Sequence, residues 1–112
     1  MLAAEHRLRS SAEFTQAVRR GRRASRPTLT AHLLVTSSGD APRAGLVVSK
    51  AVGGSVVRHR VARRLRHLLR ERVPGLLPGT LLVVRAAPAA STSTSAALGE
   101  DLDRALQRLG PA

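Results

Sequence analysis

The stretch RAGLVVSKAVGGSVVRHRVARRLRHLLRERV, residues 43–73, decides the fold because its apolar pattern changes period partway along. Its first third is apolar and β-prone, which predicts a strand that ends near Lys50. After Gly53 and Gly54 the apolar residues recur at helical spacing, so we expect a helix with Ser55 as its N-cap. The stripe of this helix that should face the core consists of Val57, Val61, Leu65, Leu68 and Leu69.

The opposite face of this helix is basic, and only Glu71 interrupts it. Its basic residues are Arg60, Arg63, Arg64, Arg66, His67 and Arg70. Like charges three and four residues apart destabilise a helix unless an anion offsets them. Guanidinium groups carry several fixed donors and stay charged at any relevant pH, so phosphate is the expected partner. The competing interpretation is a solvated charged face, exaggerated by a genome that prefers arginine to lysine.

The length and charge of the chain narrow its class. With 112 residues it should form a single domain, residues 1–112, with a modest core. The formal net charge of +12 at pH 7 is carried almost entirely by the part before residue 86, since residues 86–112 hold more acids than bases. A basic surface of this size favours a nucleic-acid partner.

The sequence contains no recognisable catalytic motif. It has no cysteine, its four histidines match no standard metal-binding spacing, and it lacks a P-loop, a GxGxxG motif and a nucleophile in a familiar setting. We therefore expect no catalytic residues and no metal site in the protein. The first ten residues lack the apolar run of a signal peptide and no segment is long enough to span a membrane, so we expect a cytoplasmic protein.

A short helix should precede the central stretch. The capping box Ser10-x-x-Glu13 opens it and Gly21 ends it. Its apolar face consists of Phe14, Ala17 and Val18. Phe14 is the only aromatic residue of the chain, so base stacking should be scarce, and a core position for Phe14 is an open alternative. A cluster that follows is either a nucleic-acid contact or a solvated loop: Arg19, Arg20, Arg22, Arg23 and Arg26.

Residues 28–36 alternate between apolar and mostly polar side chains, which predicts a half-buried strand. The apolar side holds Leu29, Ala31, Leu33 and Val35, and the side that should stay open holds Thr28, Thr30, His32, Leu34 and Thr36. His32 on the open face is either an ordinary solvent-facing histidine or part of a site for single-stranded nucleic acid. The turn at 37–42 favours an antiparallel hairpin with the strand that starts at Arg43.

The last third predicts a strand and a helix. Residues 80–85 are apolar on both faces, which is typical of a central or covered strand. After a linker at 86–94, a helix from Ser95 to Leu109 should pack on the core, stop at Gly110-Pro111 and contact no phosphate. The fold class is therefore an α+β sandwich of three or four strands in the order α-β-β-α-β-α. A βαβ crossover results if the strands that flank the basic helix are parallel.

Residues 45–71, GLVVSKAVGGSVVRHRVARRLRHLLRE, resemble the signature of the bacterial ribonuclease P protein component. In that family a strand ending in Ser-Lys and a glycine-containing loop lead into an arginine-rich helix. The stretch RLRSSAEFTQAVRRGRR, residues 7–23, is similar to the family's first helix, and LLVVRAAPAAS, residues 81–91, is similar to its third strand and loop. The resemblance extends over residues 5–109 in the right order.

This resemblance implies a βαβ crossover of the unusual left hand and a role as the protein subunit of the endoribonuclease ribonuclease P. In that enzyme the phosphodiester bond between the 5′ leader and the mature transfer RNA is hydrolysed, and the RNA subunit is the catalyst, using bound divalent metal ions such as Mg²⁺. The implied partners are the catalytic RNA and the precursor transfer RNA, with no membrane. The implied protein is a monomer within the holoenzyme.

The resemblance also implies two sets of site residues. The set that meets the catalytic RNA is Lys50, Arg58, His59, Arg60, Arg63, Arg64, Arg66 and Arg70. The set that lines a cleft for the leader, between the first helix and the sheet, is Phe14, Val18, Thr30 and His32. The chain departs from the family where His59 replaces asparagine, Ala62 replaces lysine, and Val18 and His32 replace positions that are often aromatic. The leader should therefore be held mainly by shape, backbone contacts and charge.

The main alternative is a non-enzymatic basic RNA-binding protein, either ribosome-associated or an assembly factor, which would have the same charge and fold. Membrane-surface binding through the basic helix is disfavoured, because the apolar stripe of that helix is needed to cover the sheet. A helix-turn-helix protein is disfavoured as well, because strands and a glycine pair precede the basic helix where a partner helix should be.

Overall fold

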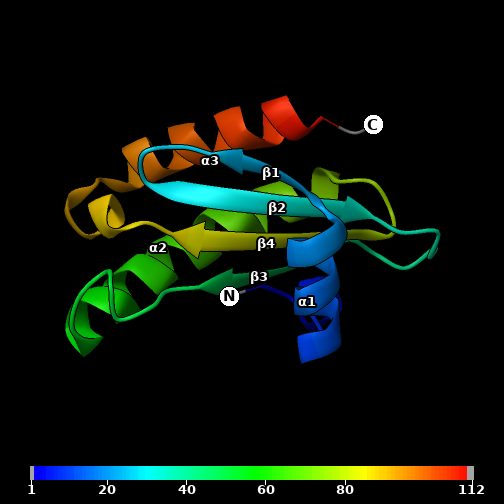
Figure 1. Cartoon of the computed structure of the whole chain (residues 1–112), viewed down its shortest axis with the longest axis horizontal. Helices are drawn as coiled ribbons and strands as arrows, with labels where there is room; N and C mark the ends of the chain where they lie inside the picture. The colour runs from blue at the N-terminus through cyan, green and yellow to red at the C-terminus, as the bar shows by residue number, and fades with distance from the viewer. Residues whose placement is uncertain (1, 111–112) are drawn as a thin grey trace.

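The computed structural model describes residues 2–110, which form a four-stranded sheet with helices on both faces (Figure 1). The helices and strands are α1 (Ser11–Arg20), β1 (Arg22–Ser25), β2 (Leu29–Val35), β3 (Arg43–Val47), α2 (Ser55–Arg72), β4 (Thr80–Ala86) and α3 (Ser95–Leu109). Short 3-10 segments are η1 (Ala4–His6), η2 (Val73–Gly75) and η3 (Pro88–Thr92). The predicted α+β class is confirmed, and β1 is a strand that the predicted order lacks.

The strand order is β1-β2-β4-β3. β2 pairs antiparallel with β1 and with β4, whereas β3 pairs with β4 in parallel, so α2 lies in a βαβ crossover. The predicted hairpin between β2 and β3 is wrong. Because β4 is apolar on both faces, it takes the central position that buries both, and β3 is left at the edge.

The larger core lies between the sheet and the two helices α2 and α3. The predicted stripe of α2 is confirmed here, with Leu65 and Leu69 fully buried against Leu82 of β4 and Leu98 of α3. Each leucine buried in this way contributes about 1.5–3 kcal/mol. The N-cap of α2 is Gly54 and not Ser55, and no side chain caps it, because the chain turns one residue earlier than the apolar pattern suggests.

The opposite face of the sheet is only partly open. α1 crosses one end of it, and Ala17 forms a second, smaller core with Leu81 and Val83, joined by Phe14. His32 is consequently only 7% exposed, so the expectation that it faces solvent is wrong. The other end of this face, where β2 begins and β4 ends, has no helix over it (Figure 1).

Ion pairs fix the position of α1 on the sheet. The Oγ of Ser10 accepts a hydrogen bond from the N–H of Glu13, as the capping box predicts. The Glu13 carboxylate then pairs with the buried Arg43 at the start of β3, and Arg43 also lies 3.3 Å from Asp40. Burial raises the pKa of Glu13, but hydrogen bonds from the Arg9 N–H and from Arg43 outweigh this effect and hold the pKa below its usual value. α1 is therefore anchored by charge as well as by packing.

The predicted C-terminal helix is confirmed. The hydroxyl of Thr94 caps its start by accepting from the N–H of Ala97 at 3.1 Å, and Gly110 ends it with a φ of 62°. Pro111, the second half of the predicted stop signal, lies outside the described residues. Between residues 2 and 110, no helix is long and apolar enough to cross a membrane.

Candidate nucleic-acid interface

The outermost basic residues of α2 are available to an external partner. The exposed ones are His59, Arg63, Arg66, His67 and Arg70. The Nε2 of His67 lies 3.3 Å from the Glu71 carboxylate. Among the described residues, no carboxylate lies within ion-pairing distance of Arg63, Arg66 or Arg70. These three guanidinium groups can therefore bind phosphate without first breaking an internal pair.

Two other predicted RNA-binding arginines make contacts within the protein. The Nη2 of Arg60 donates to the Ser91 carbonyl at 2.9 Å, and the Nη1 of Arg64 donates to the Ser93 carbonyl at 2.8 Å. Both arginines are half-buried. They hold the hydroxyl-rich segment that follows β4 beside the basic face of α2. Sequence reasoning missed this contact because nothing local links the two segments.

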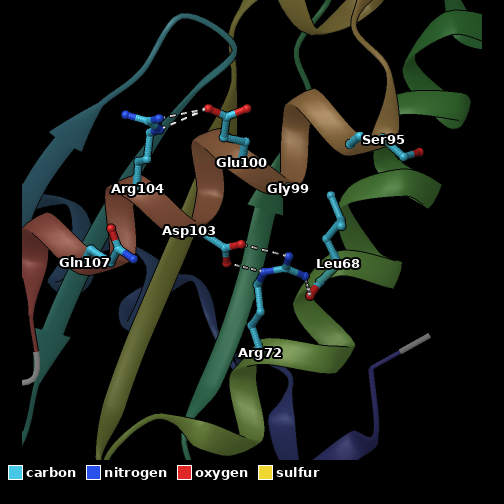
Figure 2. A pocket seen from close by; sticks show the side chains of 9 residues that line it. Leu68, Arg72, Ser95, Gly99, Glu100, Asp103, Arg104 and Gln107 are labelled. Atoms are coloured by element: carbon cyan, nitrogen blue, oxygen red, sulfur yellow. Dashed lines mark hydrogen bonds and ion pairs between the residues drawn. The ribbon is translucent and has the colours of Figure 1, made fainter.

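At the end of α2, Arg72 belongs to the scaffold. Its Nε and Nη2 donate to the two carboxylate oxygens of Asp103 at 2.6 Å and 3.2 Å, and its Nη1 donates to the Leu68 carbonyl (Figure 2). The hydrogen bond from Arg72 keeps the pKa of Asp103 below its usual value. This pair joins α2 to α3 and leaves Arg72 out of the exposed basic face.

A hollow of about 290 Å³ separates the start of α2 from the end of β3. Its lining residues are Leu46, Val48, Ser55, Arg58, His59, Ala62 and Arg66. The Nε of Arg58 is buried and has no hydrogen-bond partner within residues 2–110. An unpaired buried donor costs about 1–3 kcal/mol, so this site favours an external acceptor such as a phosphate oxygen. Lys50 is exposed in the turn just before this hollow.

The predicted leader-cleft residues lie along one end of the sheet but not all side by side. Through their pairing with Val83, His32 of β2 and Gly45 of β3 stand on either side of it, roughly 10 Å apart. Phe14 lies over Gly45, where a Cβ would overlap its ring. Phe14 also lines a hollow of about 420 Å³ that includes Arg66 of α2. Phe14 and His32 therefore flank the floor of the cleft, and Phe14 borders the basic helix.

The uncovered end of this face is polar. Thr30 pairs in register with Ser25 on one side and with Arg85 on the other, and the two hydroxyl oxygens of Thr30 and Ser25 are 3.1 Å apart. Arg85 is exposed, and it belongs to the site although the sequence analysis did not select it. The signal was present, because Arg85 is the one charged residue in an otherwise apolar strand. Val18, from the predicted set, is 38% exposed on α1.

His32 is a neutral polar group at the floor of this cleft. Burial lowers its pKa, and the charges of Arg23 and Arg85 lower it further. Its Nδ1 is buried and makes no hydrogen bond to any described residue. A neutral imidazole carries one donor and one acceptor, so His32 can complete one hydrogen bond to a ligand.

These surfaces define a class of protein: a small basic α+β domain that binds a nucleic-acid backbone through an arginine-rich helix and the adjoining face of a sheet. Between residues 2 and 110, no three histidine, cysteine, aspartate or glutamate side chains gather as a metal site would require.

Comparison with known proteins identifies the family. The sequence model described as Ribonuclease P matches residues 2–110. The ribonuclease P protein component of Streptomyces avermitilis is 56% identical over 117 residues, covering 97% of this chain and 95% of the relative. That of Nocardioides sp. is 53% identical over 112 residues, covering 98% and 96%. The chain therefore belongs to the ribonuclease P protein family, as the resemblance of residues 45–71 predicted.

Solved structures agree on the fold. The RNase P protein of Staphylococcus aureus superposes with a TM-score of 0.81 at 21% identity, over 92% of this chain and 94% of that chain. The RNase P protein of Thermotoga maritima superposes with a TM-score of 0.77 at 21% identity, over 92% and 96%. At this level of identity the likeness concerns the fold alone.

Proposed function

We propose that this chain is the protein subunit of ribonuclease P and takes part in 5′ maturation of transfer RNA in the cytoplasm. The observation that carries the proposal is the family match over residues 2–110, on a chain whose basic helix exposes arginines without internal partners. In this proposal the RNA subunit performs the hydrolysis with its own bound Mg²⁺ ions. The protein acts as a monomer that supplies binding energy and position.

The basic helix meets the catalytic RNA. Arg63, Arg66 and Arg70 each contact a phosphate through exposed guanidinium groups, and the unpaired Nε of Arg58 accepts another phosphate oxygen as its partner. Because these contacts are made to the backbone, they fix the orientation of the protein on the RNA without reading its sequence.

The cleft between α1 and the sheet holds the 5′ leader. Phe14 offers one ring face, His32 offers one hydrogen bond, and Arg85 attracts the leader phosphates from the open end of the cleft. With a single aromatic residue, the cleft binds leaders mainly by charge and shape, so it accepts leaders of different sequence. Only the precursor carries a leader, so this cleft favours substrate over product.

The test compares precursor and mature transfer RNA on the reconstituted holoenzyme. His32→Ala and Phe14→Ala should weaken precursor binding and leave mature transfer RNA almost unaffected, and Phe14→Ala should cost more because stacking on a ring is worth about 1–3 kcal/mol per base. Val35→Ala is the matched control, because it truncates an exposed side chain on the opposite face of the same strand.

Stability must be measured in the same variants, because Phe14 packs against the smaller core. Equal weakening for precursor and mature forms, in variants that unfold at the same urea concentration as wild type, would contradict leader binding in this cleft.

A further inference from the structure

A second basic surface lies at the edge of the sheet formed by β1, opposite the edge formed by β3. A hollow of about 690 Å³ opens there between β1 and α3. Its lining residues are Arg23, Ala24, Ser25, Arg26, Arg104, Gln107 and Arg108. None of the contacts proposed above for α2 uses this hollow.

The charge of this hollow is only partly balanced. Arg26 lies 3.5 Å from Asp101, and Arg104 lies 3.0 Å from Glu100 on the exposed side of α3 (Figure 2). In the part of the chain that the structure describes, neither Arg23 nor Arg108 has a carboxylate within ion-pairing distance. Apart from the alanine the lining is polar or charged, so the surface suits an anionic backbone and not an apolar peptide.

This surface continues the polar end of the leader cleft. Because Ala24 is buried in the larger core, its neighbours Arg23 and Ser25 lie on the same sheet face as His32 and Thr30. β1 has no strand on its outer side, and an edge strand offers unpaired backbone donors and acceptors. α3 runs along this edge, so its arginines extend the basic path beyond the sheet (Figure 1).

We propose that the distal, 5′ part of the precursor's leader leaves the cleft over the β1 edge and lies in this hollow, with its phosphates against Arg23, Arg104 and Arg108. This inference rests on the proposed function, because it requires the proximal leader to occupy the cleft. A single strand that follows a positively charged groove gains affinity from each phosphate it neutralises, without regard to sequence. The surface therefore makes binding depend on leader length.

The experiment uses the reconstituted holoenzyme with precursors whose leaders are about 4 and about 16 nucleotides long, which bracket the site sizes of single-strand-binding domains. The variant Arg104→Gln/Arg108→Gln removes two exposed charges. With each single-strand contact contributing about 0.7 to the slope of log affinity against log salt, wild type should lose about sevenfold more affinity than the variant between about 50 and 200 mM salt. This difference should appear with the long leader only.

Two further variants sharpen the result. Glu100→Gln frees Arg104 from its partner and should strengthen binding of the long leader. Arg9→Gln removes one exposed charge beside Glu13 and Asp40, at the β3 side of the sheet, and should leave the effect of leader length unchanged.

Equal losses for both leaders would overturn the inference, because they would assign this surface to the catalytic RNA or to the body of the transfer RNA. No loss with either leader would overturn it as well and would mean that the hollow is a solvated charged surface. Failure of the proposed function is a separate result, in which wild type binds the short-leader precursor no better than mature transfer RNA.

Discussion

The two groups of arginines on α2 should respond differently to the same substitution. Arg63 and Arg66 are exposed, whereas Arg60 and Arg64 donate to carbonyls of the segment after β4. For Arg63→Ala/Arg66→Ala we expect weaker binding to the catalytic RNA and unchanged stability. If each arginine neutralises one phosphate, the salt slope falls by about 0.7–0.9 per contact, so wild type should lose roughly 7- to 12-fold more affinity than the variant between about 50 and 200 mM salt.

For Arg60→Ala/Arg64→Ala we expect a loss of stability as well. Hydrogen bonds from charged donors are worth about 1.5–3 kcal/mol when buried, and half-exposed ones less, so the two bonds together should contribute about 1–3 kcal/mol to the free energy of unfolding. Urea unfolding measures this term, and RNA affinity over a range of salt concentrations measures the other. Unchanged stability of the Arg60/Arg64 variant, or an unchanged salt slope in the Arg63/Arg66 variant, would refute this division of roles.

Three further substitutions test the scaffold and the cleft. Leu65→Ala should cost about 2–5 kcal/mol of unfolding free energy through the cavity it leaves, and should not change the salt slope. Burial raises the pKa of Asp101, but hydrogen bonds from the hydroxyl and N–H of Thr28 outweigh it and lower the pKa. Asp101→Asn should therefore cost about 1–3 kcal/mol at neutral pH and lessen the stability lost below its ordinary value near 3.8. Since burial lowers the pKa of His32 below 6.5, stability should fall as pH drops through that range, and His32→Gln should flatten this part of the urea-unfolding profile.

Local patterns predicted the elements with long apolar repeats. α2 and α3 were correct in their faces, and β4 was correct as the central strand, because each of them buries a periodic stripe or two apolar faces. β1 was missed, since its four residues, Arg22–Ser25, include one buried side chain and read as a charged loop. Its pairing with β2 depends on the turn held by Asp101, a residue from the other end of the chain.

Long-range contacts explain the remaining differences. The turn after β2 suggested a hairpin with β3, but strand pairing depends on which strand can bury both faces, and that property belongs to β4. Alternation along β2 placed His32 on the correct face, yet it could not reveal that α1 packs over that end of the sheet. In the candidate site, spacing found the exposed arginines of α2 but not the use of Arg60 and Arg64 as internal donors.

The most direct test of the proposed function is the magnesium requirement of cleavage by a bacterial ribonuclease P RNA, measured with and without this protein. We predict that the wild-type protein restores 5′ cleavage of precursor transfer RNA at magnesium concentrations where the RNA alone is nearly inactive. We also predict that Arg63→Ala/Arg66→Ala needs more magnesium to reach the same rate, and that the protein without RNA leaves the precursor intact. A magnesium requirement that the protein does not change, or cleavage by the protein alone, would contradict the account.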